Sequence, residues 1–72
     1  MLNADLIESR IIKILEVQKK VRPKMILEQL EQEHFDLKET HSVIARMIDK
    51  NAVLFDKDWN LRINPAIKLV AA

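Results

Sequence analysis

The spacing of apolar residues changes near Asn51, and this change constrains the fold more than any other feature of the chain. From 37 to 50, apolar side chains recur every three or four residues, which is the period of an amphipathic α-helix. Beyond Asn51 the period is two, and 53–55 and 59–63 have the composition of short strands. The sequence therefore predicts a helix that leads directly into a small β-hairpin. The apolar face of this helix comprises Leu37, Ile44, Met47 and Ile48.

The ends of this helix carry their own signals. Asp36 and Glu39 stand three residues apart at its start, where each side chain can accept a hydrogen bond from a free backbone amide. Asn51 follows its end, at the position where a left-handed residue commonly terminates a helix. The helix is therefore predicted over 37–50 and the hairpin over 53–63.

Glycine is absent from all 72 residues, so another residue type must occupy every position with a positive φ. Asn and Asp tolerate this conformation best among the remaining residue types. The absence also removes the glycine-rich loops that bind the phosphates of mononucleotides and dinucleotides. The expected positive-φ positions are Asn51, Asp56, Asp58 and Asn64.

Two further helices are predicted in the first half of the chain. Asp5 and Glu8 resemble a start signal for a helix over 6–18. Pro23 suits the first turn of a second helix over 23–33, and it requires an extended Arg22 before it. Their apolar stripes are Ile7, Ile11, Ile14 and Leu15, with Leu6 and Val17 on one flank, and then Ile26, Leu27 and Leu30.

Three residues outside these stripes have specific interpretations. Val21 is expected to add a one- or two-residue strand to the hairpin, and Phe35 to fill the corner between the second and third helices. Ile12 lies off the stripe of the first helix. It is either a single exposed Ile or part of a second apolar surface that packs against another copy.

Composition sets the broad class. The chain has no Cys, so no disulfide stabilises it, and its 49% apolar content must supply the core. Its formal charge is +1, which argues against a histone-like protein or a polybasic membrane binder but is compatible with a local basic face. No apolar run approaches the roughly 18 residues of a membrane span, and charges within the first ten residues interrupt any signal peptide. A single cytoplasmic domain over 1–72 is expected.

The predicted order is a helix, a short strand, two helices and a two-stranded wing. This order resembles the winged helix-turn-helix superfamily, and the resemblance is clearest over 43–55, where a helix end, a cap and a first wing strand follow one another. It covers nearly the whole chain, but it consists of apolar positions and contains no catalytic signature. The implied fold is mainly α, with three helices and a two- or three-stranded antiparallel wing.

The resemblance implies binding to double-stranded DNA in a transcriptional regulator, with the third helix in the major groove and the wing beside the phosphates. Arg46 would read guanine edges, and Ala45 would permit close approach of the helix. The densest basic stretch precedes and opens the second helix and would hold phosphates. The expected DNA contacts are Lys38, Ser42, Ala45, Arg46 and Lys50 on the third helix, Lys19, Lys20, Arg22 and Lys24 at the second, and Lys57 in the wing turn.

Acidic residues favour an alternative function. The wing turn contains Asp56 and Asp58, and the presumed reading face includes Glu39 and Asp49. The exposed face of the second helix is also acidic. A face of nearly zero net charge gives weak non-specific DNA affinity, because few counterions are released on binding. The alternative is a winged-helix protein-interaction module or an accessory subunit that does not bind DNA.

Trp59 and the C-terminal tail bear on partners. Trp59 is interpreted either as a strand residue that packs over the core, opposite Leu54 or Phe55, or as an exposed anchor for a partner. The tail over 64–72 is too apolar for a solvated end and is expected to pack against the first helix or a partner. A homodimer through the first helix and the tail would use Ile12, Ile67, Leu69 and Val70.

Enzymatic activity is not expected. His34 and His41 are the only histidines, and with no Cys their spacing matches no familiar zinc pattern. One is expected to end the second helix and the other to flank the buried face of the third. Ser9 and Ser42 have no adjacent His and acid that would suggest a triad. No metal, cofactor or small-molecule substrate is therefore expected.

Overall fold

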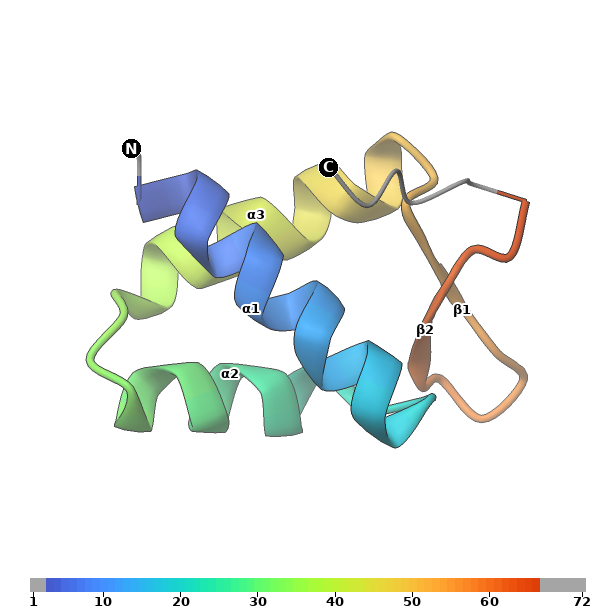
Figure 1. Ribbon diagram of the computed structural model, residues 1–72, viewed down its shortest axis with the longest axis horizontal. Helices are drawn as coiled ribbons and strands as arrows, with labels where there is room; N and C mark the ends of the chain where they lie inside the picture. The colour runs from blue at the N-terminus through green and yellow to red at the C-terminus, as the bar shows by residue number, and fades with distance from the viewer. Residues whose placement is uncertain (1–2, 67–72) are drawn as a thin grey trace.

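The computed structural model describes residues 3–66, in which three helices precede a two-stranded antiparallel sheet (Figure 1). In the sheet Val53 pairs with Ile63, Leu54 with Arg62, and Phe55 with Leu61. The order of elements is as expected, and the hairpin register, which the sequence left open, is now defined. The elements are α1 (Asn3–Gln18), α2 (Pro23–Gln32), α3 (Leu37–Asp49), β1 (Val53–Phe55) and β2 (Leu61–Ile63).

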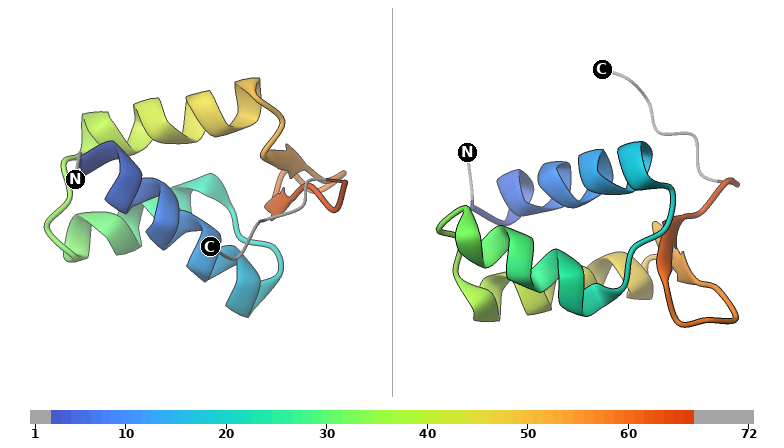
Figure 2. Two further views of the ribbon diagram at one scale, coloured as in Figure 1. Left: turned by 45° about the horizontal axis from the view of Figure 1, so that its top comes forward. Right: turned by 90° about the horizontal axis from the view of Figure 1, so that it is seen from below.

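The three helices surround one core, and the hairpin closes one end of it (Figures 1 and 2). The stripe of α1 is buried as predicted, and so are Ile26 and Leu30 of α2. Leu27 and Phe35 are partly buried and pack against this core. The side chains that are almost fully enclosed are Ile7, Ile11, Leu15, Ile26, Leu30, Thr40, Met47, Val53 and Leu61.

The buried face of α3 differs from the prediction at its first turn. Leu37 is 44% exposed, whereas Thr40 is 1% exposed. Burial of Thr40 is tolerated because its Oγ1 donates a hydrogen bond of 2.9 Å to the backbone oxygen of Asp36. Ile48 is only partly buried. The face that packs on α1 and α2 is therefore made of Thr40, Val43, Ile44 and Met47.

The predicted helix ends are largely confirmed. The Asp36 side chain accepts a hydrogen bond of 3.1 Å from the backbone N–H of Glu39, which caps α3. Pro23 begins α2 after an extended Arg22 (φ −68°, ψ 142°). The prediction for α1 is wrong at its start, because the helix already includes Asn3 and Asp5 lies within its first turn.

Positive φ angles occur mostly at unexpected residues. Asn51 has φ 61°, as predicted, but Asp56, Asp58 and Asn64 do not have a positive φ. Asp56 instead uses its side chain to form the turn, because its Oδ1 accepts hydrogen bonds from the backbone N–H groups of Asp58 (2.8 Å) and Asn60 (3.0 Å). Among residues 3–66, the other positive φ angles are at Lys19 (69°), His34 (71°) and Trp59 (64°).

Val21 joins the hairpin, as the sequence predicts. Its backbone N–H donates to the oxygen of Leu61 at 3.0 Å, and the N–H of Leu61 donates to the oxygen of Val21 at 2.8 Å. This isolated antiparallel bridge attaches the connection between α1 and α2 to the edge of β2. Both side chains are buried, so the bridge lies over the core.

Candidate nucleic-acid interface

The side of α3 opposite the core forms an exposed polar surface. Lys38, Ser42, Ala45 and Arg46 all lie on it, as expected from the helical period. The right-hand view of Figure 2 shows α1 and α3 on opposite sides of the molecule, and the turn of the hairpin extends on the side of α3. Neither Lys38 nor Arg46 forms an ion pair within residues 3–66. Two cationic side chains are therefore available on an exposed helix.

Arg46 and Ser42 lie on the flank of α3 that is nearest to α1. Together with Ala4, Glu39 and Val43 they line a shallow groove of about 210 Å³. The carboxylate of Glu39 in the same groove offsets the charge of Arg46. The positive charge of this flank is therefore local, and it does not extend along the whole helix.

Lys50 is separated from the other expected contacts on α3. It follows the last helical residue and forms an ion pair with Glu8 of α1. Lys50 is therefore turned toward α1, and part of its charge is neutralised within the protein.

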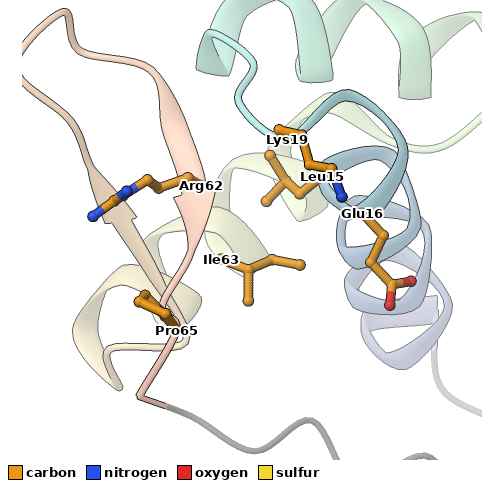
Figure 3. A pocket seen from close by; sticks show the side chains of 6 residues that line it. All are labelled: Leu15, Glu16, Lys19, Arg62, Ile63 and Pro65. Atoms are coloured by element: carbon orange, nitrogen blue, oxygen red, sulfur yellow. The ribbon is translucent and has the colours of Figure 1, made fainter.

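The basic connection before α2 is brought next to β2. Antiparallel register about the bridge between Val21 and Leu61 places Lys20 beside Arg62. Because side chains alternate along a strand, these two cations lie on the face opposite the buried bridge residues. Figure 3 shows Arg62 pointing away from α1. We therefore define a basic edge made of Lys20, Arg22 and Arg62.

The sequence interpretation missed Arg62. Arg62 directly follows Leu61, which the structure pairs with Val21 and buries. The sequence predicted a strand at Val21 but did not name its partner residue. Side chains alternate along a strand, so a residue next to a buried position faces outward. Once Leu61 is known to be buried, this alternation predicts that Arg62 is exposed.

The remaining expected cations are dispersed. Lys19 has a positive φ, and its side chain lines a groove between α1 and β2. Lys24 is exposed in the first turn of α2, and Lys57 is exposed in the turn of the hairpin. The expected DNA contacts thus form a group on α3 and a group around the basic edge, with Lys19, Lys24, Lys50 and Lys57 outside both.

Asp56 reduces the positive potential near the basic edge. A backbone hydrogen bond from Asn60 lowers the pKa of Asp56, and the hydrogen bond from Asp58 and the nearby charge of Lys20 act in the same direction. The carboxylate therefore stays ionised at neutral pH and partly offsets the charge of Lys20.

Trp59 does not pack over the core, so that interpretation is wrong. It precedes β2, lies in the turn, and is 71% exposed. Leu61 takes the inward position opposite Phe55. The ring of Trp59 packs edge-on against Phe55, with ring centroids 5.6 Å apart. An exposed aromatic pair therefore marks the hairpin.

The homodimer and its expected contacts stay a prediction. Ile12 is partly buried and packs against the core, so it is not the singly exposed Ile of the first interpretation. Ile67, Leu69 and Val70 lie outside the described residues.

Both histidines are exposed; His34 follows the end of α2, as expected, and His41 is next to the buried Thr40 of α3. Within residues 3–66, no three His, Cys, Asp or Glu side chains are grouped so that they could hold a metal ion. No helix in the same part of the chain combines the length and apolarity needed to cross a membrane.

Comparison of the chain with protein-family models, with curated proteins and with solved structures found no match.

Proposed function

We propose that this chain is a winged-helix domain that binds double-stranded DNA, with α3 in the major groove. The observation that carries the proposal is the exposed surface of α3, where Lys38, Ser42, Ala45 and Arg46 are free of the core. An α-helix fits the major groove, and small or polar side chains at its exposed positions allow its backbone to approach the base edges.

Individual residues have distinct roles in this proposal. Arg46 donates to the acceptors of a guanine edge, and Ala45 leaves room for a thymine methyl group. Lys38 and Ser42 contact bases or phosphates. The basic edge of Lys20, Arg22 and Arg62 binds phosphates that lie outside the groove occupied by α3.

The charge balance predicts the kind of binding. On the exposed face of α3, the cations Lys38 and Arg46 are matched by Glu39 and Asp49. Few counterions are therefore released, so affinity for random DNA is low and most discrimination comes from base contacts.

Fluorescence anisotropy of a labelled random duplex, at low and at physiological salt, tests the proposal. We expect micromolar binding that weakens with salt. The double substitution Lys20→Ala and Arg62→Ala is expected to weaken binding to all sequences equally and to reduce the salt slope by about 1–2. The matched control is Lys13→Ala, which removes an exposed cation of α1 outside the proposed surface. Absence of binding at low salt, or an equal effect of the control, would contradict the proposal.

Selection from a random-sequence library then provides a preferred site for testing α3. On that site Arg46→Ala is expected to cost about 1–3 kcal/mol of binding free energy and to relax the preference at one base pair. If Arg46→Ala leaves the affinity and the preference unchanged, α3 does not read the DNA.

A protein-interaction module is the second candidate function, and Trp59 favours it. An exposed Trp whose ring packs on an exposed Phe suits an interface hot spot, because burial by a partner would remove a large apolar area from water. Absence of DNA binding, combined with retention of a host protein by the wild type but not by Trp59→Ala, would favour this candidate.

A further inference from the structure

A groove of about 570 Å³ lies between the end of α1 and β2 (Figure 3). Leu15 forms its apolar floor, and Ile63 points across it toward α1. Glu16 and Lys19 contribute charge at the edges. The groove thus combines an apolar interior with charged borders, which suits a short amphipathic segment. Its lining residues are Leu15, Glu16, Lys19, Arg62, Ile63 and Pro65.

The chain leaves the described structure at the edge of this groove. Pro65 lines the groove, and Ala66 follows it directly. Asn64 fixes the direction of this exit: its Nδ2 donates to the oxygen of Asn51 at 2.9 Å, and its Oδ1 accepts from the N–H of Ala66 at 3.0 Å. The next six residues are Ile-Lys-Leu-Val-Ala-Ala, in which lysine is the only charged side chain.

We propose that residues 67–72 of the same chain occupy this groove. In an extended segment, Ile67 and Leu69 lie on one side and Lys68 lies on the other. The apolar pair then contacts Leu15 and Ile63, while Lys68 faces solvent at the border of the groove.

The flank of α1 extends the proposed site. Ile12 lies one turn before Glu16 and is only partly buried, so it continues the apolar floor along the helix. Six extended residues span about 20 Å, whereas two helical turns measure about 11 Å. The segment is therefore long enough to reach Ile12 from the exit at Ala66.

A second copy of the chain is the competing source of this segment. Attachment at the edge of the groove favours the chain's own segment, because a short tether gives an effective concentration of about millimolar. A separate copy must reach the groove at its bulk concentration. The proposal is independent of DNA binding.

Paramagnetic relaxation in the full chain tests the proposal. The chain has no Cys, so Lys68→Cys gives a unique site for a nitroxide label. We expect strong broadening of the amide signals of Ile12, Glu16 and Ile63, and much weaker broadening for Leu30 near the end of α2. Equal broadening of α1 and α2, or none, would overturn the proposal.

Two controls show whether the broadening comes from the chain's own segment in the groove or from a second copy of the chain. Adding Leu69→Asp to the labelled chain is expected to remove the broadening at Ile12 and Glu16 while the other amide shifts remain native. Mixing labelled, isotope-free chain with isotope-enriched wild type is expected to give no broadening in the wild type. Broadening in the mixture would assign the groove to a second copy and would contradict the intrachain proposal.

Discussion

Arg10 and Glu33 form a two-point ion pair that joins the middle of α1 to the end of α2. The Nε of Arg10 donates to Oε1 and its Nη2 to Oε2, and both distances are 2.8 Å. Gln29 adds a weaker hydrogen bond of 3.4 Å to Oε2. The sequence predicts an acidic exposed face for the second helix, but the carboxylate of Glu33 at the end of this helix links two helices.

This pair predicts a specific loss of stability in acid. The hydrogen bond from Arg10 lowers the pKa of Glu33 below its ordinary value of 4.5. The contribution is therefore present above the pKa of the unfolded chain and disappears as the pH falls through the lower pKa of the folded state. Glu33→Gln is expected to reduce the free energy of unfolding at pH 7 by about 0.5–1 kcal/mol.

Urea denaturation at pH 7 and pH 2 measures this difference. At pH 2 the wild type and Glu33→Gln are expected to be equally stable, because both side chains are then neutral. Glu28→Gln is the matched control, since it removes an exposed carboxylate of α2. An equal loss from Glu33→Gln at both pH values would show that the charge of Glu33 is not involved.

Lys50 is expected to contribute mainly to stability, and Lys38 mainly to DNA binding. Because Lys50 pairs with Glu8, a double-mutant cycle with Glu8→Ala and Lys50→Ala should give a coupling of about 0.2–1 kcal/mol in stability. The same cycle with Lys38→Ala should give none. In the anisotropy titration, Lys38→Ala should weaken DNA binding more than Lys50→Ala does. The reverse order would place the interface on the α1 side.

Substitution of His34 by glycine is expected to stabilise the protein. It follows the end of α2 with φ 71°, a conformation that costs a residue with a Cβ about 1 kcal/mol or more. His34→Gly is therefore expected to raise the free energy of unfolding by about 0.5–1 kcal/mol, after allowance for the greater freedom of glycine in the unfolded chain. Thermal denaturation followed by circular dichroism measures it.

The control for this substitution is His41→Gly. His41 is exposed inside α3, where glycine is expected to lower stability by about 1 kcal/mol. A loss of stability in both variants would indicate that the His34 side chain makes a contribution larger than the cost of its backbone conformation.

Trp59 provides an intrinsic reporter, since it is the only Trp. Its exposure predicts a native emission maximum close to that of the unfolded chain and ready quenching by acrylamide. Binding of a protein partner at the hairpin should shift the emission to the blue and protect it from quenching. A blue, protected emission from the free protein would mean that another surface already covers the ring.

Local patterns predicted the elements of the fold well. The apolar spacing located α2, α3 and the hairpin, and Pro23, Asp36 and Asn51 marked their boundaries. The apolar spacing did not predict burial correctly at two positions of α3, where the place of a residue in the fold decides its burial more than its side-chain type does. Leu37 is the first residue of α3, where the core does not cover it, whereas Thr40 tolerates burial because its hydroxyl donates to a backbone oxygen.

The candidate site was less accessible to sequence reasoning. The exposed residues of α3 follow from its period alone, so Lys38 and Arg46 were placed correctly on the surface. The ion pair between Lys50 and Glu8 depends on how α1 and α3 pack. The placement of Lys20 beside Arg62 depends on the bridge between Val21 and Leu61. Such contacts require the fold itself, and a single sequence does not specify them.

The bridge between Val21 and Leu61 also has a consequence for biosynthesis. Leu61 is completely enclosed and belongs to the last strand that the structure describes. A nascent chain that has only its three helices still lacks the side chain that fills the end of the core. Contacts that close such a long loop form late, because much chain entropy is lost before they stabilise the structure. The growing chain is therefore expected to remain a loose helical assembly until β2 has left the ribosome and can pair with Val21.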